Sequence, residues 1–430
     1  MKLSIIAHAE DNTRETHPEH ALSVRPVTSA QAGIFFAEQR AGMESTYNYS
    51  TRLDVKGPVS DCDLRDACTR LVAATPALRL RIGIDEATGV IVSRFDAEAP
   101  EVIEMGWLND PDQTSAAVEA ASARPLAVED GPLCRFHTFR LSEKSAAIII
   151  TVHHLITDGL SHARLIQRLA ECVNGPVEPD SALDYVDLVE RLRSCEELAR
   201  GSSQHYWYSR LLSKLPEVRC LPISSGSTGG KLVLEFSDVE AQWLRTVASL
   251  AKVSTFKVLV AAVHAALPIH EGITVLCAAA SQRSTVGIDS AVIGDFINEV
   301  VLTARHEGPD NSKLSILARE AKSWSEDLSH RNYPFIDLAN QVAASCDSLL
   351  RLDSVMIGYR RAIRSLTWNE GAVNCSADLR FTYPRAKTDL SVRFFDYPDG
   401  LECEVQWSDS LSQQSAEDFI DALHDEIVAK

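Results

Sequence analysis

Two adjacent histidines, His153 and His154, precede an Asp-Gly pair formed by Asp158 and Gly159. Imidazole is the side chain best suited to move a proton near neutral pH. Asp158 could pair with a histidine, or it could fix a turn by accepting backbone N–H groups. Gly159 permits a close backbone approach, and a helix that starts there would offer free N–H groups to a developing oxyanion. The four residues together predict a catalytic turn.

Three alternative kinds of site must be weighed against one another. A covalent hydrolase needs a nucleophile, but the chain has no GxSxG sequence and no cysteine beside these histidines. A metal site on His154 and Asp158 lacks an evident third ligand, so we expect no metal. In the third alternative, the two histidines only pack at a turn and have no catalytic role. The adjoining Asp-Gly pair makes this alternative less favoured. The missing nucleophile favours direct acyl transfer between two bound substrates.

The segments on either side of the histidines predict a strand-to-helix turn. Residues 146–150 are an apolar, largely β-branched run, which is typical of a buried strand. Residues 160–170 carry apolar side chains three and four positions apart, which predicts an amphipathic helix. Loops that rigid elements support are frequent places for function.

The same alternation of short strands and helices continues along the chain and predicts an α/β protein. We expect the strand at 133–139 to pair with the strand at 146–152, and a half-exposed strand at 78–82. Further strands are expected at 47–55, 231–236, 273–280, 300–303, 354–357, 390–394 and 401–407. Helices are expected to begin near 28 and 237, to cover 64–75, 182–215 and 256–267, and to close the chain at 416–429.

Composition narrows the class of partner and the compartment. The 430 residues include 42 Lys and Arg against 60 Asp and Glu, a formal charge of −18, which argues against a nucleic acid or an anionic membrane surface as the main partner. The ten cysteines contain no CxxC pair and are expected to be reduced. Neither a signal peptide nor a run of about 20 apolar residues is visible, so we expect a cytoplasmic protein. Residues 1–22 predict a flexible tail.

The stretch from His153 to Gly159, HHLITDG, resembles the HHxxxDG motif of the condensation-domain superfamily. This superfamily includes the condensation domains of nonribosomal peptide synthetases and chloramphenicol acetyltransferase. The likeness covers the chain from about residue 25 to its end. Other segments that resemble family motifs, in the family's order, are 29–35 (SxAQxxxW, with Phe35 for Trp), 77–82 (LRTxF, with Thr75 and Pro76 for His-Glu), 184–187 and 206–207, 293–298 (IGxFxN), 332–335 (DYPFE) and 387–390 (KxDL).

The resemblance implies an α/β fold of two chloramphenicol-acetyltransferase-like lobes. They form a V-shaped pseudo-dimer within a monomer, with an active-site tunnel between them and the HHxxxDG turn at their junction. We expect an N-terminal lobe at 23–182, which carries the motif, and a C-terminal lobe at 183–430.

The resemblance also implies an activity. A condensation enzyme transfers an acyl or aminoacyl group from the phosphopantetheine thioester of a carrier protein to an amine or alcohol, which forms an amide or ester in natural-product biosynthesis. No cofactor is then bound covalently, because the carrier's phosphopantetheine arm delivers the donor. No adenylation or carrier domain is recognisable, so a free-standing enzyme would receive an acyl or peptidyl carrier protein in trans, together with a small-molecule or carrier-bound acceptor.

The family's residue roles can be carried over position by position. His154 would assist the acceptor's nucleophile, and His153 would orient the turn. Asp158 would be a strut paired with Arg283, and Gly159 would leave room near the oxyanion. Three residues of the IGxFxN match would line the tunnel: Gly294, Phe296 and Asn298.

Three other functions share the fold. The first is an O-acyltransferase that uses acyl-CoA or polyketide donors. The second is a non-catalytic docking domain for a carrier or an enzyme, which the intact HHxxxDG makes less favoured. An epimerisation domain also carries HHxxxDG, but the IGxFxN and Tyr-Pro-Phe segments resemble condensation domains instead.

Overall fold

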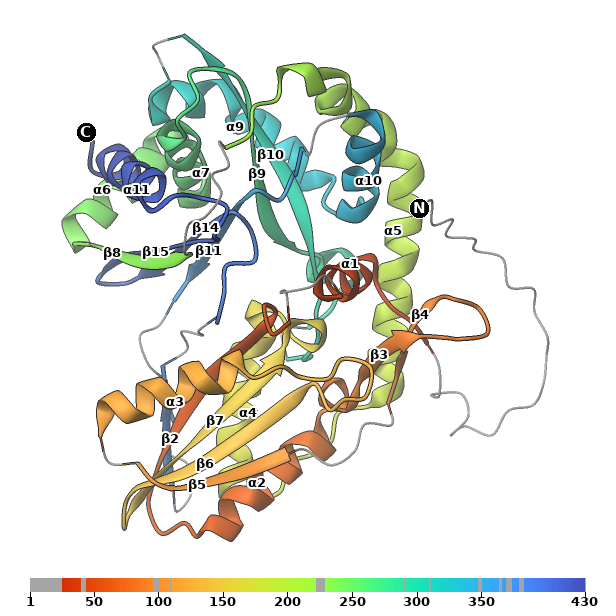
Figure 1. Cartoon of the computed structure of the whole chain (residues 1–430), viewed down its shortest axis with the longest axis vertical. Helices are drawn as coiled ribbons and strands as arrows, with labels where there is room; N and C mark the ends of the chain where they lie inside the picture. Colours follow the sequence, from red (N-terminus) through yellow and green to blue (C-terminus); the bar gives the residue numbers. More distant parts are fainter. Residues whose placement is uncertain are drawn as a thin grey trace.

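The computed structural model describes residues 25–39, 44–95, 101–108, 110–221, 229–289, 291–308, 311–346, 350–362, 366–368, 373–378 and 383–429. The expected tail at 1–22 lies outside these residues. Figure 1 shows two lobes, each built around its own sheet, with the helix α5 running beside both.

The first lobe contains a six-stranded sheet in the order β12-β13-β2-β7-β6-β5. The central strand β7 pairs antiparallel with β2 and with β6, so the expected pairing of residues 133–139 with 146–152 is confirmed. Residues 146–153 of β7 are all buried, as the apolar run predicts. The strands are β2 (Asn48–Lys56), β5 (Glu101–Trp107), β6 (Cys134–Ser142), β7 (Ser145–His153), β12 (Leu366–Trp368) and β13 (Asn374–Ala377).

Alternate residues of β7 serve two separate apolar clusters, because successive side chains point to opposite faces of a sheet. Ile148 and Ile150 join the main core of the first lobe, to which α2 (Asp61–Ala74) and α4 (Gly159–Asn174) contribute. Ile149 joins a smaller cluster with α3 (Pro111–Ala123) on the other face.

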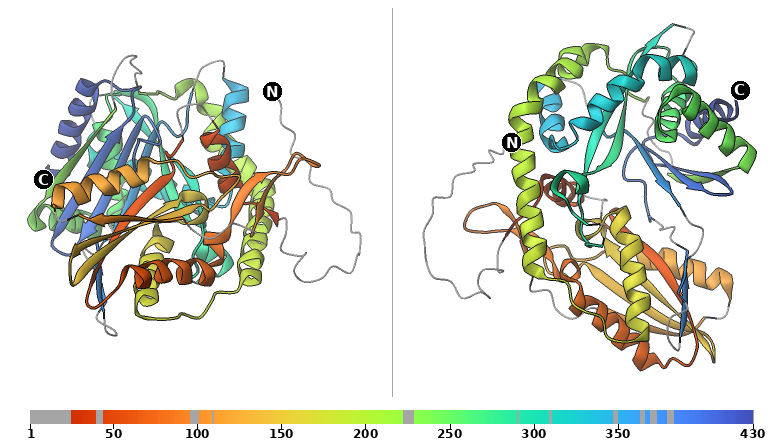
Figure 2. Two further views of the ribbon diagram at one scale, coloured as in Figure 1. Left: turned by 60° about the horizontal axis from the view of Figure 1, so that its bottom comes forward. Right: turned by 180° about the vertical axis from the view of Figure 1, so that it is seen from behind.

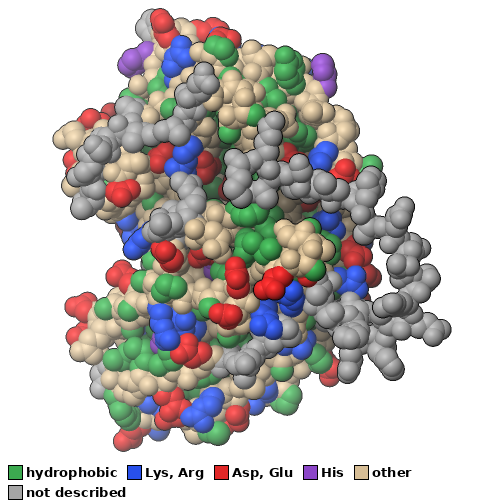
Figure 3. All heavy atoms as spheres, turned by 45° about the vertical axis from the view of Figure 1, so that its right-hand side comes forward, with side chains coloured by type: hydrophobic (Ala, Val, Ile, Leu, Met, Phe, Trp, Pro, Cys, Tyr) green, Lys and Arg blue, Asp and Glu red, His purple; other side chains and the backbone are tan. Residues whose placement is uncertain are grey.

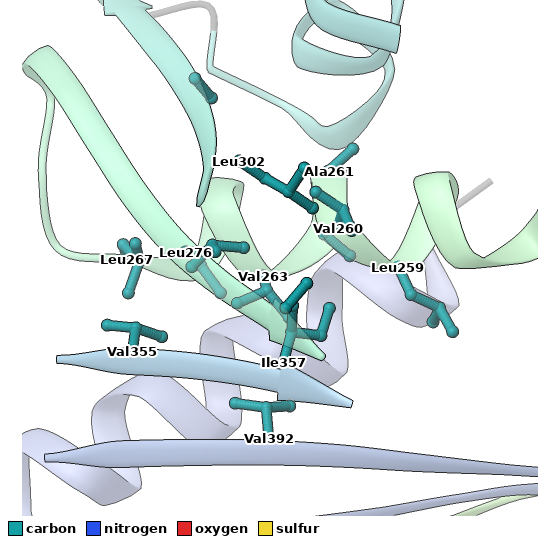
Figure 4. Packing of buried hydrophobic residues seen from close by; sticks show 14 of the residues in the cluster. Leu259, Val260, Ala261, Val263, Leu267, Leu276, Leu302, Val355, Ile357 and Val392 are labelled. Carbon is teal, nitrogen blue, oxygen red and sulfur yellow. The ribbon is translucent and has the colours of Figure 1, made fainter. Parts of the chain in front are cut away.

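The second lobe contains a six-stranded sheet in the order β10-β9-β11-β14-β15-β8. Its strands are β8 (Gly230–Phe236), β9 (Glu271–Ser281), β10 (Ile297–Glu307), β11 (Val355–Arg361), β14 (Leu390–Tyr397) and β15 (Gly400–Trp407). Its core also contains residues of α6 (Asp238–Ala251), α7 (Thr255–Ala266), α9 (Lys313–Ser329) and α11 (Gln413–Val428). Figure 4 shows Val263 of α7 packed near Leu276 and Ile357 of the sheet, with Val260 beside Leu302.

Three segments bind the two lobes together (Figure 2). The 29-residue helix α5 (Ala182–Arg210) contributes Val189 to the first core and Trp207 to the second. The turn between β9 and β10, which includes α8 (Arg283–Val286), sends Phe296 into the first core. Strands β12 and β13 leave the second lobe, and β13 pairs with β2. The expected division at residue 182 falls at the start of α5, and residues 366–377 add strands to the first lobe's sheet.

Smaller elements complete the description. Three short strands, β1 (Arg25–Pro26), β4 (Ile91–Arg94) and β3 (Arg81–Ile84), form a separate sheet. The helix α1 (Ser29–Glu38) is capped by Thr28, and α10 (Phe335–Ser345) packs beside it. Within the described residues no single helix is long and apolar enough to cross a membrane; α6 and α7 meet those criteria only as a pair bent by 105°. Figure 3 shows charged side chains of both signs spread over one face of the two lobes.

The prediction of a half-exposed strand at 78–82 is wrong for the first residues of that range. Residues Pro76–Arg79 form a 3₁₀ turn, and the strand β3 begins at Arg81. Proline at the start of the turn supplies the φ that a helical turn needs. The apolar side chains Leu78, Leu80 and Ile82 are all fully buried, so the alternating pattern reflects burial and not a regular strand.

The buried histidine His162 makes the first lobe sensitive to acid. It lies on α4, where its Nε2 is 2.7 Å from the hydroxyl of Thr51 on β2. Burial lowers the pKa of His162 to about 3, whereas an unfolded histidine titrates near 6.5. Below pH 6.5 the unfolded chain therefore binds a proton at this histidine, whereas the folded chain does not. This linkage removes about 2 kcal/mol of unfolding free energy between pH 6.5 and pH 5.

We predict that His162→Gln will reduce the acid sensitivity of folding. Glutamine can keep a partner for Thr51 but cannot titrate. Denaturant unfolding at pH 7 and pH 5 should show a smaller loss of stability in the variant than in the wild type. Equal losses in the two proteins would show that His162 does not titrate on unfolding.

Candidate active site

The predicted strand-to-helix turn is present around the two histidines. The strand β7 ends at His153, a 3₁₀ turn covers His154–Ile156, and α4 begins at Gly159. Asp158 caps this helix, because its Oδ1 accepts hydrogen bonds from the backbone N–H groups of Leu160 at 3.0 Å and Ser161 at 2.7 Å. An aspartate at this position satisfies N–H groups that would otherwise lack a partner in the first turn.

The predicted pairing of Asp158 with Arg283 is confirmed. Nη2 of Arg283 lies 3.2 Å from Oδ2 and 3.3 Å from Oδ1 of Asp158, and both side chains are buried. The other end of the guanidinium, Nη1, donates to the carbonyls of Asp289 and Val292 at 3.0 Å each. The Arg283 guanidinium also lies 4.6 Å from the centre of the Phe296 ring. The ion pair is therefore well supplied with partners and joins the two lobes.

The ion pair also holds the backbone of the segment before β10. The N–H of Asp158 donates to the carbonyl of Gly294 at 3.1 Å, and the N–H of Phe296 donates to Oδ2 of Asp158 at 3.1 Å. The hydroxyl of Ser161 accepts from the N–H of Gly294 at 3.0 Å and lies 2.6 Å from its carbonyl oxygen. The peptide groups on both sides of Asp295 are thus bonded to the HHxxxDG turn.

His153 has both ring nitrogens engaged and is fully buried. Its Nδ1 accepts a hydrogen bond from the N–H of Leu155 at 3.1 Å. The proton is therefore assigned to Nε2, which donates to Glu38 on α1. This arrangement orients the turn and leaves no ring nitrogen of His153 for a substrate.

His154 has a different environment from that of its neighbour. Its Nδ1 is buried, has no hydrogen bond to the described part of the chain, and lies 3.8 Å from Oδ1 of Asp295. Nε2 has no hydrogen bond to the described residues and is not among the buried atoms, and the side chain is 11% exposed, so this nitrogen is open to a substrate. Burial and, next, the Lys387 ammonium lower the pKa of His154, and its own backbone carbonyl counters them in part. The imidazole is therefore neutral near pH 7, as a proton acceptor must be.

Lys387 lies close to the HHxxxDG turn. Its ammonium is 4.0 Å from the centre of the Tyr383 ring and 5.1 Å from that of Tyr47. Burial, together with Arg393, lowers the pKa of Lys387 to about 7. The contact of an ammonium with aromatic faces is favourable and helps to keep a charged amine in this enclosed place.

The contacts that the structure gives for the three expected tunnel residues are all with other residues of the chain. Phe296 is fully buried against Arg283. Asn298 donates to the carbonyls of Arg331 and Tyr333 at 2.8 and 2.6 Å. At Gly294 a Cβ would lie 2.5 Å from the Phe296 ring, so only glycine fits. Direct substrate contact by these three residues stays a prediction. A Cβ at Gly159 would meet no atom within 4 Å, which agrees with the expected open space there.

Three charged residues near the histidines were not predicted: Glu38, Asp295 and Lys387. Asp295 and Lys387 lie inside segments that resemble family motifs, so a charged residue there was a usable signal. Glu38 lies 115 residues before His153 and belongs to no motif that the sequence showed. Within the part of the chain that the structure describes, no group of three or more His, Cys, Asp or Glu could hold a metal ion.

Comparison with known proteins decides the family. The condensation-domain profile matches residues 22–427. The chain belongs to the condensation-domain family. This condensation domain is 23% identical over 414 residues to bacitracin synthase 2 of Bacillus licheniformis, a match that covers 93% of the chain and 16% of the relative. Over 413 residues it is 25% identical to surfactin synthase subunit 2 of Bacillus subtilis, covering 93% of the chain and 11% of the relative. The chain thus spans less than a fifth of these synthases.

Solved structures confirm the two-lobed α/β fold. The starter condensation domain of rhizomide synthetase, in complex with C8-CoA and Leu-SNAC, superposes with a TM-score of 0.77 at 16% identity and covers 96% of each chain. The X-domain in complex with OxyB from teicoplanin biosynthesis superposes with a TM-score of 0.78 at 17% identity, covering 96% of this chain and 94% of the other. At such identities the likeness concerns the fold.

We predict that Asp158→Ala will destabilise this condensation domain strongly. The change removes a helix cap and leaves the Arg283 guanidinium buried without its carboxylate, which costs about 3–5 kcal/mol. The denaturant midpoint should fall accordingly.

The matched control is Glu190→Gln, which breaks the exposed ion pair of Glu190 with Arg25. Exposed pairs contribute roughly 0–1 kcal/mol, so its midpoint should hardly move. If the denaturant midpoint of Asp158→Ala falls no further than that of the control, Asp158 does not have the structural role assigned to it.

Proposed function

We propose that this condensation domain transfers an acyl or aminoacyl group from the phosphopantetheine thioester of a carrier protein to an amine or alcohol acceptor. Amide-forming acyl transfer is the general activity of the family. The observation that carries the proposal is the open Nε2 of His154. Of the two motif histidines, His153 has both nitrogens bonded, whereas His154 presents a neutral nitrogen with no partner among the described residues.

The chemistry requires one proton acceptor beside the acceptor's nucleophilic atom. As that nitrogen or oxygen attacks the thioester carbonyl, Nε2 of His154 takes its proton. The new C–N or C–O bond forms, the C–S bond breaks, and the proton passes to the departing sulfur as a thiol. Asp158 already accepts the N–H groups of Leu160 and Ser161, so the N–H of Gly159, which lies beside open space, is the group at the start of α4 suited to stabilise the oxyanion.

A free acyl-CoA is the second candidate donor. It is favoured by one observation, namely that a starter condensation domain of similar fold was solved with C8-CoA bound. A docking role without turnover is the third, since a domain of similar fold was solved in complex with OxyB. The unoccupied Nε2 of His154 supports catalysis over docking, because a structural histidine in a buried turn would have partners for its nitrogens, as His153 has.

We predict that His154→Ala will lower turnover by about 100-fold or more, the range that a positioned proton acceptor contributes. The assay mixes the protein, a separately purified carrier protein loaded with an octanoyl or aminoacyl group, and Leu-SNAC or a panel of amines and alcohols. Product is measured by mass spectrometry. Thermal stability and carrier binding should be unchanged.

The control is His205→Ala, which changes an exposed histidine on α5 and should leave turnover unaffected. Wild-type product from free C8-CoA, with none from loaded carriers, would replace the carrier proposal with the acyl-CoA alternative. Full activity of His154→Ala would refute the role of His154. Absence of any product, together with tight binding of a partner enzyme, would support docking.

A further inference from the structure

The carboxyl group of Asp295 lies behind His154, on the side away from solvent. Its side chain has no exposed surface, whereas that of His154 is 11% exposed. Oδ1 of Asp295 is 3.8 Å from Nδ1 of His154, and that nitrogen is itself buried. A ligand could therefore reach Nε2 of His154 but not Asp295.

Neither oxygen of Asp295 makes a hydrogen bond to the part of the chain that the structure describes. The backbone N–H of Ile297 is near enough to favour the charged form but does not have hydrogen-bond geometry. Buried carboxyl groups are almost always bonded, because an unpaired one costs free energy. A residue retained at such a cost calls for a functional explanation.

The position of this carboxyl is fixed by the ion pair that joins the lobes. The carbonyl of Gly294 accepts from Asp158, and the N–H of Phe296 donates to Asp158. The carbonyl of Phe296 accepts from the N–H of Gln282 at 2.9 Å. Asp295 stands between these anchored peptide groups, so its backbone cannot turn the carboxyl away from His154. The lobe-joining network therefore presents Asp295 to the imidazole.

We propose that Asp295 is a positioning residue for His154: its carboxylate holds the ring proton on Nδ1, leaves Nε2 bare for the acceptor, and stabilises the imidazolium that forms. The proposal rests on the proposed role of His154. The arrangement follows the general logic by which a buried carboxylate selects the tautomer of a catalytic histidine. The two atoms stand beyond hydrogen-bond range at 3.8 Å, so the carboxylate acts on the Nδ1 proton and on the imidazolium through its charge.

Several charged and titratable groups surround the pair: Tyr47 just before β2, Tyr49 of β2, His153, Asp158, Tyr185 of α5, Arg283 of α8, Tyr383 and Lys387. Burial and the Asp158 carboxylate raise the pKa of Asp295, and Lys387 lowers it. The pKa of His154 is lowered, so the imidazole stays neutral over the working range. Loss of activity toward acid then reports protonation of Asp295, which removes the working carboxylate.

The test is Asp295→Asn, which keeps the shape and removes the charge. We expect kcat to fall at least tenfold with KM for Leu-SNAC or the amine acceptor unchanged, and the acid limb of the kcat profile to disappear. The denaturant midpoint should rise, because an unpaired buried carboxyl is gone. The matched control is Glu196→Gln, which neutralises a buried carboxyl bonded to Ser29 at the start of α1, and should leave kcat within twofold.

Nitrogen-15 NMR of the histidine rings tests the tautomer without any turnover, with His154→Gln providing the assignment. At pH 8 the wild type should show the proton on Nδ1 of His154, and Asp295→Asn should show a mixture. The backbone carbonyl of His154 acts equally in both proteins, so the difference isolates the carboxyl. Identical His154 signals in the two proteins would overturn the proposal.

The two proposals fail in different ways. If His154→Ala keeps full activity, the proposed function fails, and the NMR comparison still decides the tautomer. If His154→Ala is inactive while Asp295→Asn keeps kcat within twofold, only the role of Asp295 is refuted. A lower denaturant midpoint with unchanged kcat would mark Asp295 as a structural residue.

Discussion

The ion pair between Asp158 and Arg283 is the contact on which the rest of the site depends. One carboxylate caps α4, accepts the N–H of Phe296 and neutralises a guanidinium that comes from the other lobe. A charge pair this deeply buried needs hydrogen bonds, since desolvation costs several kcal/mol per ion. On the arginine side Nη1 donates to the Asp289 and Val292 carbonyls and Nη2 also donates to Ser161, while Nε has no hydrogen bond to the described residues. The position of the second lobe relative to the HHxxxDG turn is thereby fixed.

The two adjacent histidines show how partners, more than burial, determine the role of a side chain. His153 and His154 are both shielded from solvent, yet one is locked between Glu38 and a backbone N–H and the other keeps an open nitrogen. Strand β7 ends at His153 and a 3₁₀ turn begins at His154, so the two side chains leave different elements and meet different environments. Lys387 adds a positive charge near the open histidine and helps to keep it unprotonated.

The local parts of the fold could be predicted from the sequence, and the long-range parts could not. The apolar run of β7 and the helical spacing of α4 are contained in short windows, and so is the cap at Asp158. Strand β5 was missed because most of its residues are exposed and no alternation marks it. Strand β13 is only four residues long and pairs with a strand more than 300 residues earlier. Family resemblance supplied Arg283 as the partner of Asp158, and the IGxFxN match contains Asp295, whereas Glu38 meets His153 only through tertiary packing, which leaves no periodic signal.

The antiparallel pairing of β13 with β2 has a consequence for how the molecule can be divided. Without β13, the backbone N–H and C=O groups along one side of β2 would become a bare sheet edge, which other chains can extend. The first lobe is therefore not a self-contained module that could be excised or exchanged by cutting at residue 182. Recombination between relatives would have to carry residues 366–377 along with the first lobe, so the natural unit of exchange is the pair of lobes.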